Sequence, residues 1–121
     1  MILVDTSVWI DHLRAGDPLL VQRLEAGEVL AHPFVAGELA LGNLRRRREI
    51  LDAMASLPHA VLAEHREVLD LIERERLFGE GIGYVDAHLL AATRLTAGGR
   101  LWTRDRRLHA VGTRLGVAAP G

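Results

Sequence analysis

Four acidic residues occupy positions at which an α/β protein gathers its functional groups. Two of them follow segments expected to be strands: Asp5 comes directly after the apolar run 2–4, and Asp105 lies two residues after Thr103. In open parallel sheets, functional groups collect beyond the carboxyl ends of the strands, where the connecting loops converge. Asp5 and Asp105 are therefore expected at the same edge of a sheet.

The other two acids lie on segments with helical periodicity. Glu38 is three residues after Val35, and Asp86 is three residues before Leu89. Residues three or four positions apart share one face of a helix, so both acids are expected along the apolar, core-facing side. Charged groups on such a side are seldom found without a partner.

Each acid alone also has a simpler explanation, which is an ion pair with Arg or a helix cap. Asp5 is well placed to cap the next helix, and Asp86 stands near a helix start, where negative charge is favourable. For the four together a metal site is the better interpretation, because clustered carboxylates repel one another unless cations or protons neutralise them. Oxygen ligands suit Mg²⁺ or Mn²⁺, which can activate water for attack on a phosphodiester. Asp11, further along the first helix, is expected to be a surface acid.

Strands and helices are expected to alternate along the chain and so to position these acids. The pattern predicts strands at 2–4, 29–32, 60–62, 100–103 and 115–119. It predicts helices at 7–13, 19–26, 34–44, 46–56, 64–78, 84–96 and 104–111. Such alternation is typical of an α/β protein, here with a central parallel sheet of four to five strands and helices on its faces.

Length and composition favour a single domain over residues 1–121. Of the 121 residues, 49% are hydrophobic and 26% charged, which is ordinary for a folded globular domain. The apolar runs are much shorter than the roughly 20 residues of a membrane-spanning helix, and the start does not resemble a secretory leader. A cytoplasmic protein with no membrane partner is therefore expected. Cys is absent, which excludes disulfides and Cys-ligated metals within the chain.

The segments around the four acids resemble those of the PIN-domain ribonucleases, most closely the VapC toxins of bacterial and archaeal toxin–antitoxin pairs. ILVDTSVWID is similar to the family's first strand with its Asp and hydroxyl, and VAGELALG to the helix that carries a Glu. GYVDAHLLAAT is similar to the D-x-x-[IL]-A-A-type helix, and LWTRDRRL to the segment with the fourth acid. RLGV resembles the closing strand. The resemblance covers nearly the whole chain, in the family's order.

This resemblance implies a three-layer α/β/α fold, homodimers, and Mg²⁺- or Mn²⁺-dependent endonuclease action on RNA. It also implies a cognate VapB-type antitoxin whose C-terminal tail lies across the active-site groove. Carried over by motif, the residues fall into two groups. The metal-site and catalytic acids are Asp5, Glu38, Asp86 and Asp105, and the hydroxyls that support them or contact phosphate are Thr6, Ser7 and Thr103.

Basic residues are distributed unevenly, although the net charge is only −1. All fifteen are Arg, whose planar fork suits bidentate contacts with phosphate. A solvated helix face is the simpler explanation for the run at 45–48. The alternative is RNA binding, for which the candidates are Arg45, Arg46, Arg47, Arg48 and Arg104. The six His residues match no family motif, and His88 is expected in a surface or core role.

The leading hypothesis is a toxin endoribonuclease that hydrolyses RNA with a four-carboxylate Mg²⁺ or Mn²⁺ site. The nearest alternative is a PIN-domain nuclease of RNA processing or quality control that has no antitoxin. A phosphoryl-signalling domain would also place an Asp at a strand end beside Mg²⁺, but such sites generally use a Lys, and this chain has none. A non-catalytic binder would have no need to tolerate four clustered acids.

Overall fold

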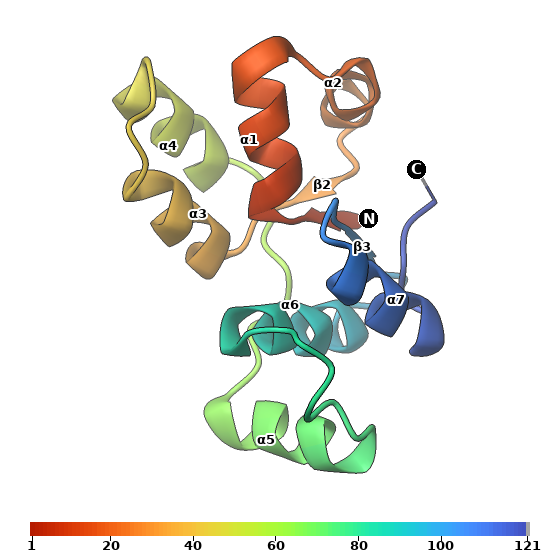
Figure 1. Ribbon diagram of the computed structural model, residues 1–121. Helices are drawn as coiled ribbons and strands as arrows, with labels where there is room; N and C mark the ends of the chain where they lie inside the picture. The colour runs from red at the N-terminus through yellow and green to blue at the C-terminus, as the bar shows by residue number, and fades with distance from the viewer. Residues whose placement is uncertain (121) are drawn as a thin grey trace.

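The computed structural model describes residues 1–120, in which helices and short strands alternate (Figure 1). The strands are β1 (Ile2–Val4), β2 (Val29–Leu30) and β3 (Arg100–Trp102). The helices are α1 (Thr6–Ala15), α2 (Pro18–Glu25), α3 (Pro33–Ala40), α4 (Arg47–Ala55), α5 (His65–Arg74), α6 (Tyr84–Leu95) and α7 (Arg106–Arg114). The predicted α/β class is confirmed.

The sheet is parallel, with strand order β2-β1-β3. In the register, Ile2 lies opposite both Val29 and Arg100, and Val4 lies opposite Trp102. All three residues of β1 are buried, as expected for a continuous apolar run in the middle of a covered parallel sheet. The chain therefore leaves β1 and β3 side by side and in the same direction, just before Asp5 and just before Thr103.

The predicted count of four to five strands is wrong, because the described chain forms three. The segments predicted as strands at 60–62 and 115–119 make only single parallel bridges at the sheet edges, Ala31 to His59 and Leu101 to Ala118. On one side Pro58 has no N–H to donate, and β2 is followed almost at once by α3. This edge therefore lacks the length of regular pairing that would make a strand, and at the other edge only Leu101 and Ala118 are bridged.

Several predicted helices are shorter in the structure. The segment predicted as a helix at 34–44 is helical only at Pro33–Ala40, because the exposed turn that begins at Leu41 interrupts the chain before α4. The proline at the first helical position and the Nδ1 atom of His32, which accepts from the Phe34 N–H at 3.0 Å, fix the start of α3. Proline is common at the first helical position, and the imidazole nitrogen here takes the role of the side-chain acceptor that Ser, Thr, Asp or Asn usually provides. The start of α3 is thus well defined, and Glu38 lies in the second turn of this helix.

Helix α6 is the most deeply buried helix of the described chain. Seven consecutive residues, Ala87 to Thr93, are buried, because α6 packs on β3 on one side and on α5 on the other. In Figure 1, α5 and α6 lie below the sheet, whereas α1 lies above it and contacts α3. None of the helices within residues 1–120 is both long enough and apolar enough to cross a membrane.

Candidate active site

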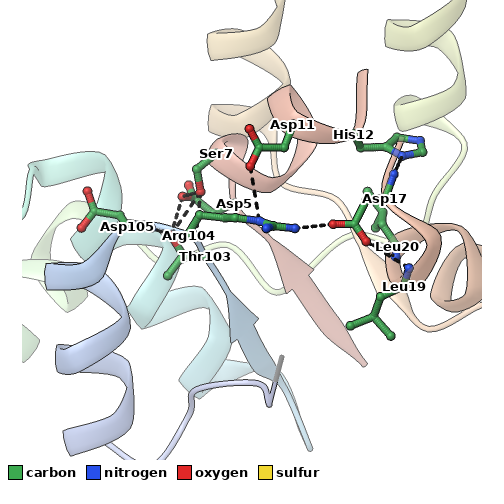
Figure 2. A network of polar contacts seen from close by, with 10 residues as sticks. All are labelled: Asp5, Ser7, Asp11, His12, Asp17, Leu19, Leu20, Thr103, Arg104 and Asp105. Carbon is green, nitrogen blue, oxygen red and sulfur yellow. Dashed lines mark hydrogen bonds and ion pairs between the residues drawn. The ribbon is translucent and has the colours of Figure 1, made fainter. Parts of the chain in front are cut away.

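Asp5 is buried at the carboxyl end of β1, with 7% of its surface exposed. Its Oδ2 atom accepts a hydrogen bond of 2.7 Å from Ser7 Oγ and another of 2.7 Å from Thr103 Oγ1 (Figure 2). Asp5 occupies the N-cap position of α1, yet its side chain makes no capping hydrogen bond. Capping therefore does not explain why a carboxylate stands there, whereas a role at the sheet edge does.

Asp105 is an exposed residue at the carboxyl end of β3, next to the same hydroxyl. Its backbone N–H donates to Thr103 Oγ1 at 3.0 Å, and its Oδ1 caps α7 by accepting from the Leu108 N–H at 2.9 Å. Thr103 is therefore bonded both to Asp5 and to Asp105. The expectation that these two acids share one edge of the sheet is met by this bridge.

Glu38 lies on α3 and reaches the same region through Thr6. Thr6 Oγ1 donates to Glu38 Oε1 at 2.6 Å. The prediction that Glu38 faces the core is wrong, because Glu38 is exposed and the buried stripe of α3 runs through Val35 and Leu39. At 100° per residue, Glu38 falls beside that stripe and not on it. Its carboxylate is therefore open to a ligand as well as to Thr6.

Asp86 is a half-buried acid, and the charges of the other three acids affect the pKa of its carboxyl. Burial raises the pKa of the Asp86 carboxyl, and the negative charges of Asp5, Asp105 and Glu38 raise it further. A hydrogen bond of 2.9 Å from the Gly83 N–H to Asp86 Oδ2 opposes this rise. Three of the acids predicted from the sequence therefore act on the fourth, Asp86, in the folded chain.

The donor set fits Mg²⁺ or Mn²⁺ by its chemistry, because four carboxylates provide hard oxygen ligands and a charge that a divalent cation neutralises. Within residues 1–120, no three acidic or His side chains already converge as a metal-binding group. Thr6 donates a hydrogen bond to Glu38. Backbone N–H groups at the starts of α6 and α7 donate to Asp86 and Asp105, respectively. Binding of one shared ion thus requires side chains to turn from these partners.

Arg104 connects the acid site to helices α1 and α2. Its backbone N–H donates to Ser7 Oγ at 3.0 Å. Its guanidinium pairs with Asp11, with Nε to Oδ2 at 3.4 Å, and with Asp17, the N-cap residue of α2 (Figure 2). Asp11 is partly exposed, as predicted for a surface acid, but its pairing was not foreseen. Nor was the role of Asp17, for which the pattern Asp-Pro before a helix was the available signal.

The Arg run at 45–48 is exposed and lies at the start of α4, where Arg47 Nε donates to the Ala40 carbonyl at the end of α3 at 2.9 Å. Arg46 Nε lies 3.3 Å from Glu49, and Arg48 Nη1 lies 4.0 Å from Asp52. These are local helix-surface pairs of the kind that salt screens readily. Whether this run contacts RNA stays a prediction.

Comparison with known proteins gives the chain a family. The family that matches is described as PIN domain, and the match covers residues 2–113. Two relatives named Ribonuclease VapC32, from Mycobacterium tuberculosis strains CDC 1551 / Oshkosh and ATCC 25618 / H37Rv, are each 52% identical to this chain over 118 residues. The alignment covers 98% of this chain and 95% of each relative. The chain therefore belongs to the PIN-domain family and is of the VapC type.

Proposed function

We propose that this protein is a Mg²⁺- or Mn²⁺-dependent endoribonuclease that acts in the cytoplasm as the toxin of a type II toxin–antitoxin pair. The observation that carries the proposal is the placement of Asp5 and Asp105 at the carboxyl ends of the neighbouring strands β1 and β3, where Thr103 is hydrogen-bonded to both. Burial and the charges of Asp5, Asp105 and Glu38 also raise the pKa of the half-buried Asp86 carboxyl. Four carboxylates at one edge of a sheet are a site for a divalent cation and a phosphodiester. The ribonuclease name of the VapC32 relatives agrees with this chemistry.

The hydroxyls around Asp5 give its carboxylate one orientation. Both hydrogen bonds, from Ser7 and Thr103, go to Oδ2, and within residues 1–120 no hydrogen bond to Oδ1 is formed. Oδ1 of Asp5 is thus the carboxylate oxygen that is available to bind a ligand. Because Asp5 is buried, it loses little conformational entropy when it binds one, so the site is preorganised at this residue.

Asp86 and Glu38 differ from Asp5 in their surroundings. The raised pKa of the Asp86 carboxyl reports a charged form that is poorly stabilised without a cation. Glu38 is exposed and held only by Thr6 among the described residues, so it can turn toward a ligand at small expense. A bound Mg²⁺ or Mn²⁺ would supply Lewis-acid polarisation of the scissile phosphate and of an attacking water.

Three partners belong to the proposal: an RNA substrate, a second copy of this chain in a homodimer, and a VapB-type antitoxin that covers the acid site. A PIN-domain nuclease of RNA processing would share the same site but would lack the antitoxin. Co-expression with a small reading frame directly upstream of the gene distinguishes them. A toxin is expected to co-purify with that product and to arrest growth without it.

Cleavage of RNA by the purified full chain tests the activity. We expect transfer and ribosomal RNA fragments to be cut in Mg²⁺ or Mn²⁺ but not in EDTA. Asp5→Asn and Asp86→Asn should each reduce the rate by at least about 100-fold, because each removes a charge that the site needs. Asp70→Asn, an exposed acid on α5, serves as the matched control and should cleave like the parent.

Two outcomes would contradict the proposal. Cleavage by the Asn variants at the parent's rate would show that the acids do not carry the activity. Millimolar Mn²⁺ that leaves the melting temperature of the parent unchanged would favour a non-catalytic binder, since a ligand of the folded state must stabilise it.

A further inference from the structure

A row of aromatic and imidazole rings lies between the starts of α3 and α6. His88 is at its centre, with ring centroids 4.7 Å from Phe34 and 4.7 Å from Tyr84, both edge-to-face. His65 continues the row beyond Tyr84 at 5.5 Å. We call these four residues the ring row. It joins three helices that are far apart in sequence, and none of its members was assigned a function from the sequence.

Hydrogen bonds and the burial of His88 hold the ring row in place. The Tyr84 hydroxyl is hydrogen-bonded to His88 Nε2 at 2.9 Å and also to His65 Nδ1. His88 is buried, with 6% of its surface exposed. These contacts fix the plane of the Tyr84 ring, so that it does not have to be ordered when a ligand arrives.

Besides the exposed His65, two rings of the row are open to solvent, with exposed fractions of 39% for Phe34 and 44% for Tyr84. Both belong to the helices that carry two of the four acids. Phe34 is one turn before Glu38 on α3, and Tyr84 is two residues before Asp86 on α6. Residues four apart share a helix face, so the exposed ring of Phe34 lies beside Glu38, one of the proposed metal-site acids. Tyr84, two residues from Asp86, lies on a different face of α6 and is joined to Phe34 through His88.

We propose that Phe34 and Tyr84 form a stacking site for an unpaired nucleobase of the RNA strand, next to the phosphodiester held by the acids. The inference rests on the proposed function and adds to it a preference for a single-stranded segment at the cleavage position. Aromatic side chains bind unpaired bases by stacking, and this mode is common in recognition of single-stranded RNA.

The row is better suited to a base than to a phosphate. Phe34 and Tyr84 offer uncharged rings, and phosphates are bound mainly by Arg, Lys and N–H groups. The third exposed ring, His65, is hydrogen-bonded through Nδ1 to the Tyr84 hydroxyl. A purely structural role is the alternative, because aromatic rings often seal the edge of a core. A sealing role predicts loss of stability on replacement, whereas a stacking role predicts loss of RNA affinity with the fold intact.

Binding of a single-stranded 12-nucleotide RNA that carries 2-aminopurine at successive positions tests the site. The assay uses the full chain in Ca²⁺, with the RNA confirmed intact on a gel, so that the readout is independent of cleavage. We expect quenching of 2-aminopurine at one or two positions in the parent complex. Phe34→Leu and Tyr84→Leu should each relieve this quenching and weaken binding by roughly 5- to 150-fold, the range for loss of one stacked base.

Two controls separate the ring from its surroundings. Tyr84→Phe keeps the ring and removes the hydroxyl, so it should retain most of the parent's affinity and quenching. Phe78→Leu removes a still more exposed aromatic side chain that lies outside the ring row, and it should bind like the parent. The salt dependence of binding should be unchanged in all these variants, because phosphate contacts are retained.

Equal affinity of the parent, Phe34→Leu and Tyr84→Leu would overturn the stacking site and leave the proposed function standing. Tyr84→Phe as weak as Tyr84→Leu would also overturn it, since the hydroxyl network would then be the cause. Should Phe34→Leu melt well below the parent, the more exposed Tyr84 decides the question. A parent chain that neither binds nor cleaves RNA would contradict the proposed function itself.

Discussion

Thr103 donates a hydrogen bond of 2.7 Å from Oγ1 to Oδ2 of Asp5, across a separation of 98 residues in the chain. The same hydroxyl oxygen accepts from the Asp105 N–H at 3.0 Å. Backbone pairing, including the 2.9 Å bond from the Asp5 N–H to the Trp102 carbonyl, holds the ends of β1 and β3 together. The buried Thr103 hydroxyl adds a link between the Asp5 carboxylate and the backbone of Asp105.

Replacement of Thr103 by Val should test this link. Val has nearly the same shape but no hydroxyl, so the variant leaves a buried carboxylate with fewer donors and a backbone N–H without its acceptor. We expect the free energy of unfolding to fall by about 1–3 kcal/mol, the usual penalty for a buried group left unsatisfied. Urea denaturation measures this, and RNA cleavage should fall with it.

Thr103→Ser is the matched control, because it retains the hydroxyl and loses only a methyl group. It should keep most of the activity that Thr103→Val loses. A Val variant that is as stable and active as the parent would show that the link between Asp5 and Asp105 is not needed.

In the metal-free protein at neutral pH, Asp86 should lower the free energy of unfolding. Burial and three neighbouring acids raise its pKa in the folded chain, so the folded state binds a proton more tightly than the unfolded state does. Stability contributed by this group is therefore lost as pH rises above the unfolded value of about 4, and the loss is complete once the folded group has ionised. In EDTA at pH 7, Asp86→Asn should have a higher free energy of unfolding than the parent.

The difference between parent and Asp86→Asn should shrink at acidic pH, where the carboxyl is protonated in both states. Asn can still accept from the Gly83 N–H, so the start of α6 is preserved in the comparison. Urea titrations of both proteins at several pH values measure the trend. A parent more stable than Asp86→Asn at pH 7 without metal would contradict it.

The acids were predictable because strand ends and helix periodicity are local properties of a sequence. A parallel sheet brings Asp5 and Asp105 together whatever the details of its edges. The short edges were not predictable, since β-pairing depends on the element into which each segment leads: the bridge between Ala31 and His59 extends no further because α3 begins two residues after Ala31. The local pattern of apolar residues alone does not predict how many residues of an edge segment will pair with the sheet.

The side chains that organise the site were harder to foresee, because their partners are distant in sequence. Arg104 was considered as an RNA contact, yet it pairs with Asp11 and Asp17 from two other helices. The ring row is a similar case, since Tyr84 and His65 meet only after α5 packs on α6. Periodicity predicts which face of a helix is buried but not which polar groups meet across two helices.

The two sets of Arg residues should differ in their effect on RNA binding. If the run at 45–48 binds phosphates, its replacement by Ala should weaken binding and reduce the slope of log affinity against log salt by about 0.7 for each phosphate that is no longer neutralised. Arg104→Gln should change that slope little, because two carboxylates already neutralise the guanidinium. Binding titrations at several salt concentrations measure both, and an unchanged slope in the Ala variant would return the run to a solvated helix face.

His32 should make the protein sensitive to acid. Burial, followed by the nearby His88 and His59, lowers the pKa of the His32 imidazole to about 4, whereas an unfolded His titrates near 6.5. The folded state therefore excludes a proton that the unfolded state binds. The resulting stability is fully present above about pH 6.5 and is lost as pH falls toward 4, by about 3 kcal/mol in all.

The matched variant is His32→Asn, which removes the titrating group but can still accept from the Phe34 N–H at the start of α3. Its absolute stability at pH 8 is expected to be lower, because a buried ring is lost. The informative quantity is the change in the free energy of unfolding between pH 7 and pH 4, measured with urea. That change should be smaller in His32→Asn than in the parent, and identical changes in the two proteins would show that His32 is not the source of the acid sensitivity.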